Sequence, residues 1–116
     1  MPEKMKIYHN PRCRKSRETL QLLQDSGVEP QIVLYLQDVP SREELKELLG
    51  KLGMEAKALV RKGEAAYKEH YKGKDLSEEE WIDAMLTHPK LIERPIVVLG
   101  NNAVLGRPPE NVKALL

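Results

Sequence analysis

The chain has 116 residues, of which 41% are hydrophobic and 32% charged, and this balance is ordinary for one soluble globular domain. Nineteen basic residues against eighteen acidic ones leave a net charge of +1, which gives no general attraction to nucleic acid or to an anionic membrane. The single cysteine excludes an internal disulfide and a cysteine cage for zinc.

No apolar stretch approaches the roughly 20 residues that a membrane span needs. The N-terminal residues also lack the apolar segment of a secretion signal. We therefore expect a cytoplasmic protein with no membrane partner.

The first third of the chain predicts a strand, a helix and a second strand. Residues 5–8 alternate in polarity like a strand, and a polar turn broken by Pro11 follows them. A helical pattern then runs from Arg14 to about Asp25, and residues 31–36 are rich in β-branched and aromatic side chains. This order and spacing indicate parallel strands joined by a right-handed crossover.

The middle of the chain, at about 40–90, predicts a helical insert. Ser41 and Glu44 have the spacing of a capping box and open one helix, and Ser77 and Glu80 open another. Residues 54–75 are mostly polar, and we expect short helices there.

The last quarter predicts a hairpin and a final short helix. Residues 95–99 form a continuous apolar run, as a buried strand does, and residues 103–106 return after a turn. Prolines 108 and 109 then open a helix that runs to Leu116. The order β-α-β, helical insert, β-β-α predicts an α/β protein of the thioredoxin-like fold, with a four-stranded mixed sheet and a single domain over residues 1–116.

Cys13 is the candidate nucleophile, because it lies between the first strand and the N-terminus of the first helix. Unpaired N–H groups and the helix dipole favour an anion there. The basic flanks of the cysteine and nearby His9 should also lower the thiol pKa below its free value of about 8.5. Ser16 completes a Cys-x-x-Ser spacing, and its hydroxyl could face the sulfur. The opposing hypothesis is an inert cysteine under the helix.

A lowered pKa cannot supply the catalysis alone. A fall of about two pKa units would ionise roughly three quarters of the thiol at neutral pH, but the lower nucleophilicity of a weaker base cancels most of that gain. The other reactant must therefore be held in place, and arginines suit an oxyanion. Arg61, Arg94 and Arg107 are candidates, and we expect Pro95, after Arg94, to be cis and next to the nucleophile loop. Each arginine could instead be a solvated surface charge.

Four segments together resemble a known family. These segments, residues 8–17, 59–62, 92–98 and 105–108, are similar in order and spacing to the glutaredoxin-coupled arsenate reductase (ArsC) family. The resemblance implies that the Cys13 thiolate attacks arsenate while Arg61, Arg94 and Arg107 hold the oxyanion. It also implies supporting roles for His9, Asn10 and Ser16.

The resemblance further implies that glutathione acts as a co-substrate and that glutaredoxin clears the resulting mixed disulfide. A single cysteine fits this route, because the second and third thiols must come from outside the chain. We expect no bound cofactor, no metal and a monomer. Arg14 and Lys15 make the loop more basic than in some family members, and their effect is open.

Three other functions compete with this interpretation. A general glutathione-dependent reductase of disulfides would often lack the third arginine, so Arg107 favours arsenate. An Spx-type regulator that binds RNA polymerase usually carries a second cysteine where this chain has Ser16. The third alternative is a non-enzymatic domain that retains the fold.

Overall fold

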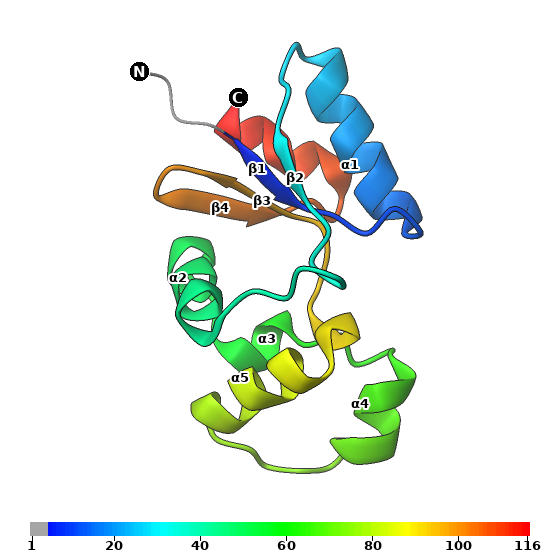
Figure 1. Ribbon diagram of the computed structural model, residues 1–116, viewed down its shortest axis with the longest axis vertical. Helices are drawn as coiled ribbons and strands as arrows, with labels where there is room; N and C mark the ends of the chain where they lie inside the picture. The colour runs from blue at the N-terminus through cyan, green and yellow to red at the C-terminus, as the bar shows by residue number, and fades with distance from the viewer. Residues whose placement is uncertain (1–4) are drawn as a thin grey trace. The chain divides into compact units, whose positions relative to one another are not determined.

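The computed structural model describes residues 5–116, which divide into two compact units (Figure 1). The first unit comprises the chain up to Asp38 together with Arg94–Leu116, and the second is Val39–Glu93. The first unit contains β1 (Lys6–Tyr8), α1 (Arg14–Asp25), β2 (Gln31–Val33), β3 (Ile96–Leu99), β4 (Asn102–Leu105) and the 3₁₀ helix η2 (Pro109–Leu115). The second contains α2 (Arg42–Leu52), α3 (Ala56–Leu59), α4 (Ala65–His70), α5 (Glu78–Thr87) and the 3₁₀ helix η1 (Pro89–Leu91). That all 116 residues form one domain stays a prediction.

The sheet confirms the predicted four-stranded mixed arrangement. Its strands lie in the order β2-β1-β3-β4, with β1 parallel to β2 and antiparallel to β3, and with β3 and β4 paired as an antiparallel hairpin. The carboxyl ends of β1 and β2 therefore lie at the same edge of the sheet, and the loops that leave these ends are neighbours.

Two predicted elements need correction. The second strand was expected over 31–36 but ends at Val33, because the carbonyl of Leu34 accepts hydrogen bonds from the N–H groups of Gln37 at 2.9 Å and Asp38 at 2.8 Å and so forms a turn. The final helix is of the 3₁₀ type and ends at Leu115.

One face of the sheet forms the core of the first unit. Ile7 of β1 and Val97 of β3 are opposite each other in register and are inaccessible to solvent. They cluster with Leu23 of α1 and Val112 of η2, so this helix pair covers the face (Figure 1). Burial of these apolar side chains fixes α1 against the sheet and thereby places its N-terminus at the end of β1.

The second unit is mainly helical, and α2 and α5 begin where the sequence predicted. Ser41 accepts the N–H of Glu44 at 3.1 Å, and Ser77 forms a complete reciprocal capping box with Glu80. Gly53 adopts a left-handed conformation (φ 67°) and ends α2.

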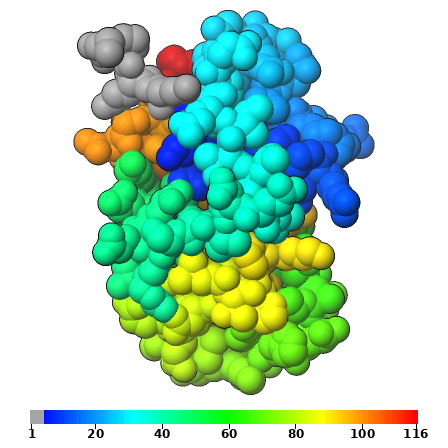
Figure 2. Space-filling view, viewed as in Figure 1, coloured from blue at the N-terminus to red at the C-terminus, as the bar shows by residue number. Residues whose placement is uncertain are grey.

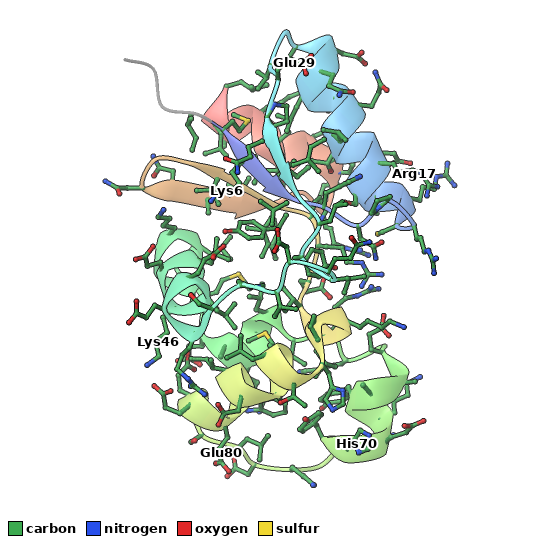
Figure 3. All side chains as sticks on the ribbon, viewed as in Figure 1. Lys6, Arg17, Glu29, Lys46, His70 and Glu80 are labelled. Carbon is green, nitrogen blue, oxygen red and sulfur yellow. The ribbon has the colours of Figure 1, made fainter. Side chains whose placement is uncertain are left out.

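The helices of the second unit pack through a shared apolar interior. Leu48 of α2, Leu59 of α3 and Met85 of α5 are all buried, and α5 contacts α2, α3 and η1. Exposed ion pairs from Arg42 and Lys46 to Glu79 join α2 to α5, and Lys46 is marked in Figure 3. In the space-filling view the green-to-yellow residues form one continuous body (Figure 2). Between residues 5 and 116, no helix has the length and apolarity to cross a membrane.

Candidate active site

The loop between β1 and α1 is held in shape by its own backbone. The N–H of His9 donates to Val33 at 2.9 Å, which ties the loop to the end of β2. Asn10 then closes a tight turn, because its carbonyl accepts the N–H of Cys13 at 2.9 Å and its side-chain oxygen accepts the N–H of Arg12 at 3.0 Å. Cys13 consequently occupies the N-cap position of α1 in an extended conformation, beside the unpaired N–H groups of the first turn.

The environment of Cys13 favours its thiolate. Partial burial raises the pKa of the thiol, but hydrogen bonding from the backbone N–H of Ser16 and from the Arg94 side chain, the positive charge of Arg94 and the N–H of Lys15 outweigh it. The net result is a pKa below the ordinary value. The sulfur therefore lies beside both the helix N-terminus and a guanidinium, the two kinds of group that stabilise a thiolate.

The predicted direction of this pKa shift is correct, and so is the predicted contribution of the N–H groups at the helix N-terminus, but the predicted contribution of the basic flanks is not. The side chains of Arg12, Arg14 and Lys15 are not among the groups that act on the sulfur. Arg14 pairs with Glu18 at 2.9 Å, four residues along the same helix face, and its side chain is 83% exposed. Arg94, which is 81 positions away in sequence, supplies the charge instead.

Ser16 acts through its backbone rather than through the expected contact of its hydroxyl with sulfur. The hydroxyl oxygen is buried, lies 2.7 Å from Nδ1 of His9 and accepts the N–H of Asn10 at 3.0 Å. Burial and the nearby charge of Arg17 lower the pKa of His9, so the imidazole is neutral over a wider pH range. Arg17, marked in Figure 3, also donates to the carbonyl of Pro11 at 2.9 Å. His9, Asn10 and Ser16 thus form one network behind the nucleophile loop.

Two residues that the sequence did not single out link α1 to the arginine-bearing loops. Thr19 is inaccessible to solvent, and its hydroxyl lies within hydrogen-bond distance of the carbonyls of Lys15 (2.8 Å) and Gly106 (3.1 Å). The N–H of Gly106 donates to the carbonyl of Pro95 at 2.9 Å, and the Arg94–Pro95 bond is cis, as expected. A β-carbon at Gly106 would come within 2.8 Å of Thr19 and Pro95. Glycine fits there because the side chains of Thr19 and Pro95 occupy the space that a β-carbon would need.

Arg107 lies in the same unit, directly after Gly106. Its carbonyl accepts from the side chain of Asn111 at 3.2 Å, which holds the loop between β4 and η2. The link from Gly106 to Thr19 brings this loop to the helix that carries Cys13. Contact of the Arg107 guanidinium with an anion at Cys13 stays a prediction.

Arg61 belongs to the second unit and is engaged there. Its Nε lies 3.3 Å from Glu93, its Nη1 lies 3.5 Å from Glu64, and its backbone N–H donates to Leu91 at 2.6 Å. Glu93 in turn donates its N–H to Leu59 at 2.9 Å, so Arg61 and Glu93 lie on a short antiparallel ladder. Its convergence with Cys13 also stays a prediction.

This arrangement can perform nucleophilic chemistry on an anion. A stabilised thiolate is the attacking group, and Arg94 with the N–H groups of the first turn of α1 offers positive charge to oxygen atoms bound near the sulfur. Among residues 5–116, no group of three or more histidine, cysteine or acidic side chains could hold a metal ion.

Comparison with known proteins agrees with this description. The family model described as "ArsC family" matches residues 8–115. An uncharacterised protein of Escherichia coli K12, YfgD, is 54% identical over 114 residues, which cover 97% of this chain and 96% of that protein. An arsenate reductase of Haemophilus influenzae is 46% identical over 112 residues, covering 95% of this chain and 97% of the relative. The solved structure of an arsenate reductase from Vibrio cholerae, 50% identical, superimposes with a TM-score of 0.94 over the full length of both chains. With a family match over nearly all its residues and relatives of such identity, the chain belongs to the ArsC family.

Proposed function

We propose that this protein reduces arsenate to arsenite through a covalent intermediate on Cys13. The observation that carries the proposal is the pairing of a stabilised thiolate with the Arg94 guanidinium at the same sulfur. A disulfide substrate needs the thiolate alone, whereas an oxyanion also needs positive charge where its oxygen atoms lie. Relatives named as arsenate reductases, at 42–46% identity, support the choice of arsenate among oxyanions.

The first step is a condensation without change of oxidation state. The sulfur of Cys13 attacks arsenic, a sulfur–arsenic bond forms, and one oxygen leaves arsenate as water after taking up protons. Negative charge moves from sulfur to the arsenate oxygen atoms during attack. Arg94 is therefore the arginine that we assign to the transition state, with Arg107 next to it in this role.

The second step is the two-electron reduction, and it needs an external thiol because the chain has one cysteine. Glutathione attacks the adduct, a disulfide forms between its sulfur and that of Cys13, and the sulfur–arsenic bond breaks. Arsenic keeps that electron pair, one of its oxygen atoms takes up the thiol proton, and the product leaves as arsenite. A glutaredoxin thiolate then attacks the mixed disulfide, carries off the glutathionyl group and restores the Cys13 thiolate.

We propose that Arg61 closes over the bound anion. Glu64 and Glu93 hold its guanidinium in the second unit. Glu93 is followed directly in sequence by Arg94. An arriving oxyanion would replace one carboxylate as partner of Arg61, so this arginine should contribute to binding more than to the chemical step.

The remaining features of the proposal follow from its chemistry. The reaction uses glutathione as a co-substrate and needs no resident cofactor or metal, since the thiols supply both electrons. A glutathione-dependent reaction places the protein in the cytoplasm. We propose a monomer, because no step needs a group from a second copy of the chain.

A coupled assay that compares arsenate with a glutathione mixed disulfide tests the function. Wild type with glutathione and glutaredoxin should reduce arsenate faster, and Cys13→Ser should retain less than about 1% of that rate because a serine hydroxyl is hardly ionised at neutral pH. Thermal melting of Cys13→Ser serves as the folding control. Efficient turnover of the mixed disulfide with none of arsenate would instead identify a general thiol reductase. Full arsenate activity in Arg107→Ala would contradict the three-arginine site and remove the reason for preferring arsenate that Arg107 supplies. Efficient arsenate reduction with thioredoxin alone would contradict the proposal that glutathione and glutaredoxin supply the second and third thiols.

A further inference from the structure

A pocket of about 280 Å³ opens beside the nucleophile loop. Its walls are His9, Asn10, Pro11 and Arg12 of that loop and Leu34, Leu36 and Gln37 of the turn after β2. Both segments leave the same edge of the sheet, and the hydrogen bond from His9 to Val33 holds them together. Figure 2 shows the blue loop residues and the cyan residues after β2 meeting at the surface. The volume is close to the lower end of the range for small-molecule sites, about 300–1,000 Å³.

We propose that this pocket binds the peptide part of the external thiol, glutathione, and aims its sulfur at Cys13. The inference rests on the proposed function, because it assigns a site to the co-substrate of the reductive step. Four of the residues in its walls, His9 to Arg12, directly precede Cys13 in the loop. Arg94 and the helix N-terminus, which act on the sulfur itself, are not among its walls. An oxyanion and a thiol could therefore be bound at the same time.

The distances allow one ligand to span the pocket and the sulfur. Arg12 lies in the wall of the pocket and directly precedes Cys13, so their α-carbons are about 3.8 Å apart. An extended tripeptide reaches roughly 10 Å, which exceeds that separation. A tripeptide seated against the turn at Leu34–Gln37 can therefore bring a central thiol to the neighbouring residue of the loop.

The chemistry of the walls suits a small anionic peptide. Leu34 and Leu36 give an apolar wall for methylene groups, and the Gln37 amide can both donate and accept hydrogen bonds. Arg12 is exposed and takes part in none of the ion pairs formed within residues 5–116. The other basic neighbours, Arg14 and Lys15, both pair with Glu18. Arg12 is thus the cation at this pocket that can bind a ligand carboxylate.

Arg12 and Arg14 form a matched pair for testing the pocket. Each lies one residue from Cys13 and carries the same charge, but only Arg12 lines the pocket. We expect Arg12→Gln to raise the KM for glutathione about tenfold, while the kcat at saturating glutathione and the KM for arsenate change less than twofold. Arg14→Gln should leave all three within twofold. Arg12→Lys should recover part of the affinity, and Gln37→Glu should raise the KM for glutathione by repelling a carboxylate.

Equal changes in Arg12→Gln and Arg14→Gln would overturn the pocket and indicate a general effect of charge. Alkylation of Cys13 against pH should be the same in both variants, which separates binding from any change in the thiolate.

A binding measurement keeps the pocket testable apart from the reaction. S-methylglutathione cannot form a disulfide, and we expect it to shift the backbone amide NMR signals of Leu34, Leu36 and Gln37 in wild type but not in Arg12→Gln. Shifts confined to other residues, or none at millimolar ligand, would overturn the pocket while leaving arsenate reduction intact. Pocket binding without any arsenate turnover would instead refute the proposed function alone.

Discussion

The two compact units use their arginines in opposite ways. In the unit that carries Cys13, the Arg94 side chain acts directly on the sulfur and lowers its pKa. In the unit 39–93, Arg61 is held at 3.3–3.5 Å by Glu93 and Glu64. Arg94 therefore has a role before any substrate binds, whereas Arg61 is already neutralised by carboxylates. The difference shows that arginines which a family resemblance assigns to one substrate can have different partners before the substrate binds.

Arg94 and Arg61 should therefore contribute differently to the binding and the reaction of arsenate. Before substrate binds, the positive charge of Arg94 stabilises the Cys13 thiolate. As negative charge moves from the sulfur to the arsenate oxygen atoms during attack, the same guanidinium can stabilise those atoms. An arginine paired with carboxylates must exchange one partner for another, and the net gain from such an exchange is small. Arg94 should therefore contribute to the chemical step and Arg61 to retention of the anion.

Replacement of each arginine by alanine should separate the two roles most strongly. Arg94→Ala removes a group that favours the thiolate, so the pKa of Cys13 should rise and arsenate kcat/KM should fall roughly hundredfold. Arg61→Ala should raise the KM for arsenate and leave the pKa of Cys13 unchanged. Alkylation rates against pH and steady-state kinetics measure both. A raised pKa in Arg61→Ala would break the distinction between the units.

A pair of glycine substitutions compares the packing of the two units. Gly106→Ala forces a β-carbon to within 2.8 Å of Thr19 and Pro95, and overpacking of this kind costs about 1–3 kcal/mol. Activity should fall as well, because the loop that precedes Arg107 must move. Adding Thr19→Ala removes two of the three close contacts and should restore part of the stability lost.

Gly63→Ala in the second unit is the matched control, since a β-carbon there meets nothing within 4 Å. Urea unfolding compares the variants. Equal stability of Gly106→Ala and Gly63→Ala would show that the close approach at Gly106 is not restrictive.

Removal of a helix cap should weaken the second unit without altering the thiolate. Ser77→Ala deletes the hydroxyl that accepts the N–H of Glu80 at 3.2 Å, and loss of such a cap costs about 1 kcal/mol. Hydrogen exchange in α5 should become faster, while the alkylation profile of Cys13 should match that of wild type. A shifted profile would mean that the sulfur environment depends on the helical unit.

The smallest effect should appear as a pH dependence confined to the first unit. The pKa of buried His9 lies below its ordinary value of 6.5, so the unfolded chain binds more protons than the native protein as pH falls below 6.5. The contribution of neutral His9 is complete above pH 6.5 and is lost as pH falls toward the folded pKa. Urea unfolding at several pH values should therefore show a steeper acid loss for wild type than for His9→Gln. If the stability of wild type and of His9→Gln changed with pH in parallel, His9 would not be the source of the acid loss of stability.

Much of the fold was predictable from local patterns. The caps at Ser41 and Ser77, the apolar run of the third strand and the break after Gly53 are all local signals, and each appears in the structure. The strand at 31–36 was overextended because the apolar run from Leu34 to Leu36 has the composition of a strand. Its backbone forms a turn instead, and composition does not record which hydrogen bonds the backbone makes.

The site was predictable in its residue types but less so in its contacts. The position of Cys13 at a helix N-terminus and the effect of the N–H groups there follow from the sequence, whereas the charge that Arg94 supplies to the sulfur does not. Arg14 could have been assigned to Glu18 from their i,i+4 spacing. Thr19 and Gly106 are 87 positions apart, so their contact depends on how α1 and the hairpin pack. Ser16 and Thr19 are three residues apart and lie on the same buried face of α1, and this spacing is the sequence signal that could have indicated a role for Thr19.

The buried hydroxyl of Ser16 also couples the nucleophile loop to the tautomer of His9. The Ser16 oxygen lies 2.7 Å from Nδ1 of His9 and accepts the N–H of Asn10. A hydroxyl has one hydrogen to donate and two lone pairs, so the direction of its bond to Nδ1 follows the tautomer of the ring. In the tautomer in which Nδ1 accepts, the neutral imidazole carries its proton on Nε2 and is a hydrogen-bond donor there without being a cation. Ser16→Ala removes this partner from both tautomers and would free the ring to exchange between them.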